Sequence, residues 1–280
     1  MTIDPVVAGV DGSTRDAATI EAATREAMLR RRPLRLVHAY AWPPAGSVLV
    51  PELAVASLQA YTDRARKVMA EAVRMASPVN ATTVVRRGSP AAVLRDESRR
   101  ACLLVLGERR DRPLAGLMLG SVAVKAAARS ACPVLVVRGE PRPGGPVLAG
   151  VDGSPASIHA LTYAAEAAAR RDADLIVLQA CPPGPDDTGP VTDEELSFAA
   201  TLAALTGRHP GLRLRWQIRP GPARRVLTYF SRTAQLIVVG DRGFGGVAGL
   251  LLGSVSQHLI HKSACPTVVV HRSPLRSAGG

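Results

Sequence analysis

The amino-acid sequence predicts an α/β protein made of two tandem domains, each built on a doubly wound, five-stranded parallel sheet. Four observations predict this class. The chain has 280 residues, which is long for one α/β unit and enough for two of about 140 residues each. Its 47% of apolar side chains can fill two cores, which excludes general disorder. The other two observations are an internal repeat and an alternation of short apolar runs with helical stretches.

The repeat consists of four matched segments that occur twice in the same order. The matched pairs are residues 7–13 with 148–154, 104–107 with 237–240, 119–122 with 252–255, and 131–134 with 264–267. The offset is 141 at the first pair and 133 at the other three, so the second copy is eight residues shorter between them. This order of matches indicates a tandem duplication.

The repeat and the loop-forming residues between the copies predict the domain boundaries. We expect a first domain at residues 1–139, a linker rich in proline and glycine at 140–145, a second domain at 146–272 and a flexible tail at 273–280.

Each element of the first copy follows from its local pattern. Short apolar or β-branched runs predict strands, and longer amphipathic stretches predict helices, one of which has a proline in its first turn. The expected order is strand 6–10, helix 14–31, strand 34–39, helix 53–76, strand 82–86, helix 90–101, strand 103–106, helix 121–128 and strand 134–137. Continuous apolar strands separated by helices imply a parallel sheet that is covered on both faces.

Chemically interesting residues follow the first and fourth strands of each copy. Asp11 and Asp152 come directly after the first strands, and Gly107 and Gly240 end the fourth strands. Ligands of a doubly wound sheet bind at the carboxyl ends of the strands, where the strand order reverses. If the first and fourth strands are neighbours, each aspartate faces a glycine loop across one crevice.

The loop of the second copy, residues 240–254, has the composition of a phosphate-binding loop. Its glycines allow the backbone to approach a phosphate chain closely, and Ser254 begins a helix whose free N–H groups and hydroxyl form an anion site. Asp152 could hold a ribose hydroxyl or a magnesium ion that bridges phosphates. The alternative is that the glycines only make tight turns.

These motifs resemble those of the universal stress protein family in its tandem two-domain form. The family's nucleotide loop is Gly-x2-Gly-x9-Gly-Ser/Thr, and Gly240, Gly243, Gly253 and Ser254 fit it at every position. The resemblance covers residues 6–271, twice over. It implies the strand order 3-2-1-4-5, with ATP and Mg²⁺ bound in the crevice. It also implies pairing of domains through their last strands, and edges not used within the chain would predict a homodimer.

The resemblance implies a role for each matching position of the second copy. Asp152 would contact the ribose and metal end of ATP, and the backbone around Gln179 and Ala180 would meet the adenine. The ribose and phosphates would lie on Gly240, Gly243, Gly253 and Ser254, with Val255 and Ser256 in the first turn of the helix.

The first copy departs from the family pattern. The corresponding positions there are Asp11, Ala39, Gly107, Gly120 and Ser121. Arg110 replaces the second glycine of the loop, where a side chain would block close approach. Alternatively, Arg109, Arg110 and Arg112 could hold phosphates by charge. We therefore expect the second domain to be the better ATP site.

Other classes of function find little support in the sequence. No residues are arranged as a catalytic centre or a metal cluster, so we expect no enzyme, although slow ATP hydrolysis stays open. The four cysteines form no Cys-x-x-Cys pair, and Cys132 and Cys265, each before a proline, are expected to be small buried hydrophobic residues. The absence of a leader-like N-terminus and of long apolar runs favours a cytoplasmic protein with no membrane partner.

The net charge of +12 suits polyanionic partners but specifies none. Only 3% of the residues are aromatic, which disfavours a binder of single-stranded nucleic acid. The sequence therefore predicts a regulatory or sensory ATP-binding protein of the stress response, in which ATP orders the loop at residues 241–252 for an unknown protein partner. The alternatives are a nucleotide-independent interaction platform and a slow ATP-hydrolysing enzyme.

Overall fold

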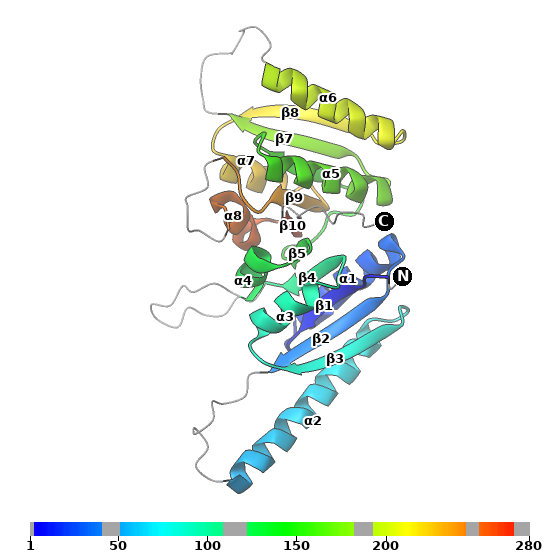
Figure 1. Ribbon diagram of the computed structural model, residues 1–280. Helices are drawn as coiled ribbons and strands as arrows, with labels where there is room; N and C mark the ends of the chain where they lie inside the picture. Colours follow the sequence, from blue (N-terminus) through cyan, green and yellow to red (C-terminus); the bar gives the residue numbers. More distant parts are fainter. Residues whose placement is uncertain (1–2, 41–50, 109–121, 182–192, 245–251, 272–280) are drawn as a thin grey trace, which may run out of the picture. The chain divides into compact units, whose positions relative to one another are not determined.

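A computed structural model describes residues 3–40, 51–108, 122–181, 193–244 and 252–271 of the chain. The chain consists of two compact units, unit 1 at Met1–Val137 and unit 2 at Arg138–Gly280 (Figure 1). Both units alternate strands with helices in the order that the sequence predicts for an α/β fold.

The elements of unit 1 match the expected order of strands and helices. They are β1 (Val6–Val10), α1 (Asp16–Arg30), β2 (Leu34–Tyr40), α2 (Pro51–Met75), β3 (Ala81–Arg87), α3 (Pro90–Ser98), β4 (Leu103–Gly107), α4 (Val122–Arg129) and β5 (Val134–Val137).

Unit 2 repeats the same succession. Its elements are β6 (Val147–Val151), α5 (Pro155–Arg170), β7 (Leu175–Cys181), α6 (Asp193–Arg208), β8 (Leu214–Pro220), α7 (Ala223–Phe230), β9 (Leu236–Gly240), α8 (Ser254–Lys262) and β10 (Thr267–Val270).

All strand pairs within each unit are parallel, and the first strand of each unit lies between the second and the fourth. In unit 1, Val6 of β1 is level with Leu34 of β2 and with Leu103 of β4, and the order is β3-β2-β1-β4-β5. In unit 2 the order is β8-β7-β6-β9-β10. The strand order thus reverses between β1 and β4 and between β6 and β9, so that the expected neighbours are confirmed.

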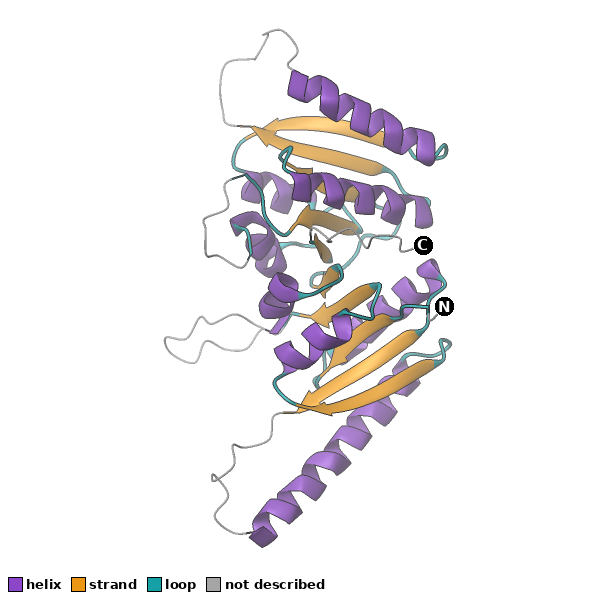
Figure 2. Cartoon of the chain, in the orientation of Figure 1, coloured by secondary structure: helices purple, strands orange, loops and turns teal. Residues whose placement is uncertain are grey.

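Helices cover both faces of each sheet, as Figure 2 shows. In unit 1, α1 packs beside α2 and α3 packs beside α4. The central strands are therefore buried on both sides, and side chains such as Leu36 and Leu104 in unit 1 and Leu148 and Ile237 in unit 2 are fully buried. This burial explains why the central strands are continuous apolar runs rather than alternating ones.

The ends of the expected helices of unit 1 differ from the observed ends by up to three residues, and hydrogen bonds explain two of these differences. The helix expected at 14–31 begins at Asp16, because residues 13–16 form a turn in which the Asp16 N–H donates to the Ser13 carbonyl at 3.1 Å. The helix expected at 90–101 ends at Ser98, and the N–H groups of the next three residues bond to carbonyls three positions back. Cys102 then donates to the Pro5 carbonyl at 2.9 Å, which starts the strand geometry of β4.

Two further properties bear on the kind of protein. Within the part of the chain that the structure describes, no helix combines the length and hydropathy needed to cross a membrane. Cys132 and Cys265 are buried, with 5% and 0% of their surface exposed, so the prediction that they are small core residues is confirmed.

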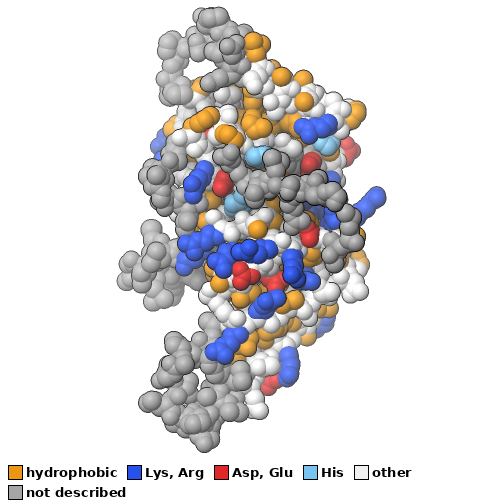
Figure 3. Space-filling view, viewed as in Figure 1, with side chains coloured by type: hydrophobic (Ala, Val, Ile, Leu, Met, Phe, Trp, Pro, Cys, Tyr) orange, Lys and Arg blue, Asp and Glu red, His pale blue; other side chains and the backbone are white. Residues whose placement is uncertain are grey.

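Some of the arginines form ion pairs with acidic side chains. Lys and Arg side chains are more prominent than Asp and Glu on the face drawn in Figure 3. However, the buried carboxylate of Glu97 pairs with Arg35 at 3.4 Å and with Arg86 at 3.0 Å. Asp174 similarly accepts from Arg213 and Arg215. These arginines are engaged with acidic side chains, and the net charge alone does not define a surface for a polyanion.

Candidate functional site

Unit 2 positions the Asp152 carboxylate with a tight turn between β6 and α5. Ser154 caps the helix, since its Oγ accepts the Ser157 N–H at 3.3 Å. The Asp152 Oδ1 accepts from the Ser154 N–H at 3.1 Å and from the Ser154 hydroxyl at 2.6 Å. The carboxylate is therefore held in one orientation at the carboxyl end of β6.

The glycine loop lies directly opposite this aspartate. The Asp152 Oδ2 accepts the Phe244 N–H at 3.2 Å, four residues after the end of β9. A Cβ atom on Gly243 would overlap Asp152 Oδ2. The expectation that the aspartate and the glycine loop face each other is confirmed, and the contact explains why residue 243 is a glycine.

The amino end of α8 forms the third side of the site. α8 begins at Ser254, as expected, and its N-cap is Gly253, which has no side chain to cover the first free N–H groups. The Gly253 N–H donates to the Asp241 carbonyl at 2.7 Å, and the Ser256 hydroxyl donates to the same carbonyl at 3.1 Å. These bonds close the base of the loop, whose residues 245–251 lie outside the described residues. An exposed helix N-terminus at this point favours an anionic ligand.

These features surround a cavity of about 180 Å³ in unit 2. Eight of the predicted site residues line it, namely Asp152, Ala180, Gly240, Gly243, Gly253, Ser254, Val255 and Ser256. Gln179 is not among the lining residues, whereas its neighbours Leu178 and Ala180 are. Successive side chains of a strand point to opposite faces, so the Gln179 side chain lies on the other face of β7.

Sequence reasoning missed several lining residues of this cavity. Ser157 of α5 and Arg242 of the loop take part, and α7 contributes Ala223 and Leu227. The α7 residues belong to no motif, because they supply apolar surface rather than a distinctive chemistry. The repeat offset of 133 relates them to Pro90 and Leu94, which line the corresponding cavity of unit 1.

Unit 1 has a smaller cavity, of about 100 Å³, at the same place in its sheet. Asp11, Ala39 and Gly107 line it, as predicted. Gly120 and Ser121, the other predicted residues of this copy, lie outside the described residues, as do Arg109, Arg110 and Arg112.

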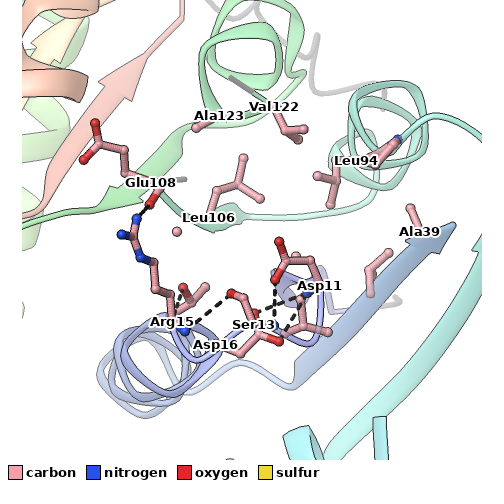
Figure 4. Close-up of a pocket in the computed structure, with 16 residues that line it drawn as sticks. Asp11, Ser13, Arg15, Asp16, Ala39, Leu94, Leu106, Glu108, Val122 and Ala123 are labelled. Atoms are coloured by element: carbon pink, nitrogen blue, oxygen red, sulfur yellow. Dashed lines mark hydrogen bonds between the residues drawn. The ribbon is translucent and has the colours of Figure 1, made fainter. Parts of the chain in front are cut away.

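Two polar residues that sequence reasoning missed, Arg15 and Asp16, line the unit 1 cavity (Figure 4). Arg15 Nη1 donates to the Glu108 carbonyl at 2.7 Å, which ties the start of α1 to the end of β4. The Asp16 carboxylate is 9% exposed and accepts the N–H groups of Asp11 and Gly12, with distances of 3.2 and 2.7 Å. Burial raises the pKa of the Asp16 carboxyl above its ordinary value near 3.8, and the bonds from Gly12 and Asp11 oppose that rise.

The fold and these two cavities define a duplicated, doubly wound α/β protein with one cavity per unit, each at the point where the strand order reverses. The family model of the universal stress protein family matches residues 2–138 and again 145–271. The chain belongs to the universal stress protein family, in tandem form.

Individual relatives agree with this assignment. Over 293 residues the chain is 35% identical to universal stress protein Rv2005c of Mycobacterium tuberculosis, covering 96% of this chain and 97% of that protein. It is 34% identical to universal stress protein Rv2623 of the same organism, with 96% of both chains covered.

Solved structures support the fold. A universal stress protein from Archaeoglobus fulgidus superposes with a TM-score of 0.72 at 17% identity, covering 97% of this chain and all of that one. A Pseudomonas aeruginosa protein described as a putative universal stress protein gives a TM-score of 0.64 at 18% identity, with 97% and 94% covered.

Proposed function

We propose that this protein binds ATP in unit 2 and uses nucleotide occupancy as a regulatory or sensory state in a stress response. The observation that carries the proposal is the juxtaposition of the Asp152 carboxylate, the Gly243 backbone and the amino end of α8 around one cavity. A carboxylate and a helix N-terminus on opposite sides suit a ligand with hydroxyl groups at one end and phosphates at the other.

The cavity offers different chemistry to the parts of ATP. Its apolar lining from Leu178, Leu227 and Val239 suits the adenine ring. The free N–H groups at the start of α8, together with the exposed side chain of Arg242, suit the phosphates. Asp152 is the group that would accept from the ribose hydroxyls or hold the metal.

A magnesium ion fits this arrangement as a ligand-bridging ion. Mg²⁺ is commonly held by one or two carboxylates together with substrate phosphates and waters. The described residues contain no group of three or more side chains suited to a metal, and a phosphate-bridged ion would not require one. Asp152 would supply the protein's carboxylate, and the ion would neutralise part of the phosphate charge.

We propose binding rather than turnover, in the cytoplasm, with a protein partner that distinguishes the ATP-bound state. Asp152 hydrogen-bonds to Ser154 and to the backbone of Phe244, and no described histidine lies in the cavity lining to act as a base. Most of the loop at residues 241–252 lies outside the described residues, so its ordering by ATP remains a prediction. Equal hydrogen exchange of this loop with and without ATP would contradict it.

The test is a calorimetric titration of the whole chain with magnesium–ATP, together with a measurement of phosphate release. We expect saturable binding with one strong site per chain and negligible release. Gly253→Trp is the variant designed to block the site, because even a Cβ atom on Gly253 comes within 3.1 Å of the Asp241 carbonyl oxygen. It should abolish binding. No heat at millimolar ATP would instead favour a nucleotide-independent interaction platform, and rapid phosphate release would favour an enzyme.

A further inference from the structure

The cavities of the two units differ in one buried group at a matched position. Asp16 and Ser157 each lie five residues after the aspartate that follows the first strand of the unit. In unit 1 the Asp16 carboxylate accepts the N–H groups of Asp11 and Gly12. In unit 2 the Asp152 N–H meets only a hydroxyl at this position, the Ser157 Oγ at 3.4 Å. Unit 1 thus carries a carboxylate where unit 2 carries a neutral group.

The Asp16 carboxylate belongs to the wall of the unit 1 cavity. It lines the cavity together with Asp11 and Ser13, as Figure 4 shows. Burial raises the pKa of its carboxyl, and the hydrogen bonds that it accepts from backbone N–H groups oppose this rise by stabilising its charged form. Two carboxylates therefore stand at the end of β1, while the unit 2 counterpart has the single carboxylate of Asp152.

The neighbouring cation, Arg15, also lines the cavity and keeps its charge, because its described hydrogen bond goes to a neutral carbonyl. In Figure 4 the Arg15 guanidinium points toward Glu108, and its Nη1 donates to the Glu108 carbonyl at 2.7 Å. The position that corresponds to Arg15 in unit 2 is Ala156. The described lining of unit 1 thus has the carboxylates of Asp11 and Asp16 beside one guanidinium, whereas that of unit 2 has the carboxylate of Asp152 beside Arg242. The additional carboxylate repels the negative charge of a metal-free phosphate group in the same cavity, and this repulsion is stronger in a partly desolvated space than in water.

The rest of the unit 1 cavity suits a neutral organic ligand. Val37, Leu94 and Leu106 give it apolar walls, and its volume of about 100 Å³ is smaller than the 180 Å³ of unit 2. Carboxylates accept hydrogen bonds but cannot donate them, so a fitting ligand presents hydroxyl or amine donors to Asp11 and Asp16. A nucleoside, with a flat ring and ribose hydroxyls but no phosphate, has this chemistry.

We infer that the two units select different ligands, that unit 1 takes an uncharged nucleoside-type molecule, and that Asp16 is the residue that excludes phosphate from unit 1. This inference rests on the proposed function of unit 2, since it assigns the opposite preference to unit 1. It makes the chain a sensor with two unlike sites rather than a protein with one active and one degenerate copy of the same site.

The first experiment measures ligand binding to unit 1 in the full chain, with the site of unit 2 blocked. Gly243→Val blocks unit 2, because any Cβ at this position overlaps the Asp152 carboxylate. ATP is used here and in the reciprocal experiment without Mg²⁺, so that no ion bridges carboxylates and phosphates. Calorimetric titration of this variant should show binding of adenosine and at least tenfold weaker binding of ATP. Adding Asp16→Ser, which copies the residue of unit 2, should raise ATP affinity at least tenfold and lower adenosine affinity. Unchanged affinities for both ligands would overturn the inference.

The reciprocal experiment protects the test against a folding defect of Asp16→Ser. Ser157→Asp, in the otherwise unchanged chain, should lower the ATP affinity of unit 2 at least tenfold. His159→Asp is the matched control, because it adds the same charge to α5 at an exposed residue outside the cavity lining. It should change ATP affinity less than threefold. Full ATP affinity in Ser157→Asp would overturn the role assigned to the carboxylate.

The outcomes also separate this inference from the proposed function. If the unchanged chain binds no ATP, the proposed function fails. The adenosine titrations alone then test whether unit 1 binds a nucleoside. Adenosine binding to Gly243→Val that weakens at least tenfold in Gly243→Val/Asp16→Ser would then support the nucleoside site. Absence of adenosine binding to Gly243→Val would overturn it.

Discussion

At the scale of single residues, the contact between Gly243 and Asp152 determines the shape of the unit 2 site. The loop backbone lies so close to the carboxylate that residue 243 has no room for a side chain, and the neighbouring Phe244 N–H donates to the same carboxylate at 3.2 Å. The glycine spacing in the sequence identifies this position, but the reason for the glycine depends on a contact across 91 residues of sequence.

Replacing Gly243 with alanine tests this contact. We expect Gly243→Ala to lower ATP affinity at least tenfold, because Asp152 or the loop must move away from the position that binds the ligand. The melting temperature should change by less than about 3 °C, since the site is at the surface of the unit. Calorimetric titration and thermal unfolding measure the two effects.

The control for this substitution is Gly207→Ala. Gly207 lies in the last turn of α6, and no atom lies within 4 Å of an added Cβ. We expect this variant to keep its ATP affinity and to be slightly more stable, because alanine favours the helix over glycine. If Gly243→Ala instead binds ATP as tightly as the unchanged chain, the present position of Asp152 is not required for ATP binding.

At the scale of elements, the two copies of the first helix begin in different ways. α5 has a serine N-cap, Ser154, whose side chain accepts the Ser157 N–H. α1 begins two residues later relative to its aspartate, its N-cap is Arg15, and no side chain caps it. In unit 1 the Asp16 carboxylate instead accepts the N–H groups of the turn, from Asp11 and Gly12. The sequence VDGS is the same in both copies, so this difference arises from residues beyond the shared motif, where unit 1 has Thr14 and Asp16 and unit 2 has Pro155 and Ser157.

This difference predicts unequal costs for the same substitution. Ser154→Ala should destabilise unit 2 by about 1 kcal/mol, the usual cost of a lost N-cap, and should also weaken ATP binding because Ser154 orients Asp152. Ser13→Ala, at the matched position of unit 1, should cost less than about 0.5 kcal/mol. Urea unfolding of both variants measures the free energies. Equal losses would mean that Ser154 does not act as a cap.

Features set by neighbouring residues in the sequence could be predicted, whereas features that depend on contacts between distant segments could not. The strands, the helices and their order follow from local apolar patterns, and the repeat extends each interpretation to the second unit. The site residues that belong to motifs, such as Gly253 and Ser254, were also predicted. The apolar lining from α7, at Ala223 and Leu227, was missed, because such residues are common in any amphipathic helix and only the folded chain brings them to the cavity.

At the scale of the whole molecule, the duplication places the same buried thiol in both units. Cys132 and Cys265, which are 133 residues apart, precede the last strands of their units. Burial raises the pKa of each thiol to about 12 from an ordinary value near 9.0, although hydrogen bonds to Ser130 and Ser263 oppose the rise. These two thiols should therefore respond to alkaline pH in the same way.

The raised pKa values predict a loss of stability above pH 9. Between pH 9 and 12 the thiols ionise in the unfolded chain but stay protonated in the folded one, so each rise in pH favours unfolding. At pH 10.5 this amounts to about 2 kcal/mol for each cysteine, at 1.36 kcal/mol per pKa unit. Below pH 9 the two thiols contribute no pH dependence.

Urea unfolding at pH 7.5 and pH 10.5 measures this effect, and Cys132→Ala/Cys265→Ala is the informative variant. Alanine leaves a small void and lowers the stability at both pH values equally, so only the difference between the two pH values matters. That difference should be about 4 kcal/mol smaller in the double variant than in the unchanged chain. Cys181→Ala, at the half-buried end of β7, should retain the full difference. An identical alkaline loss in the double variant would mean that both thiols reach solvent before the units unfold.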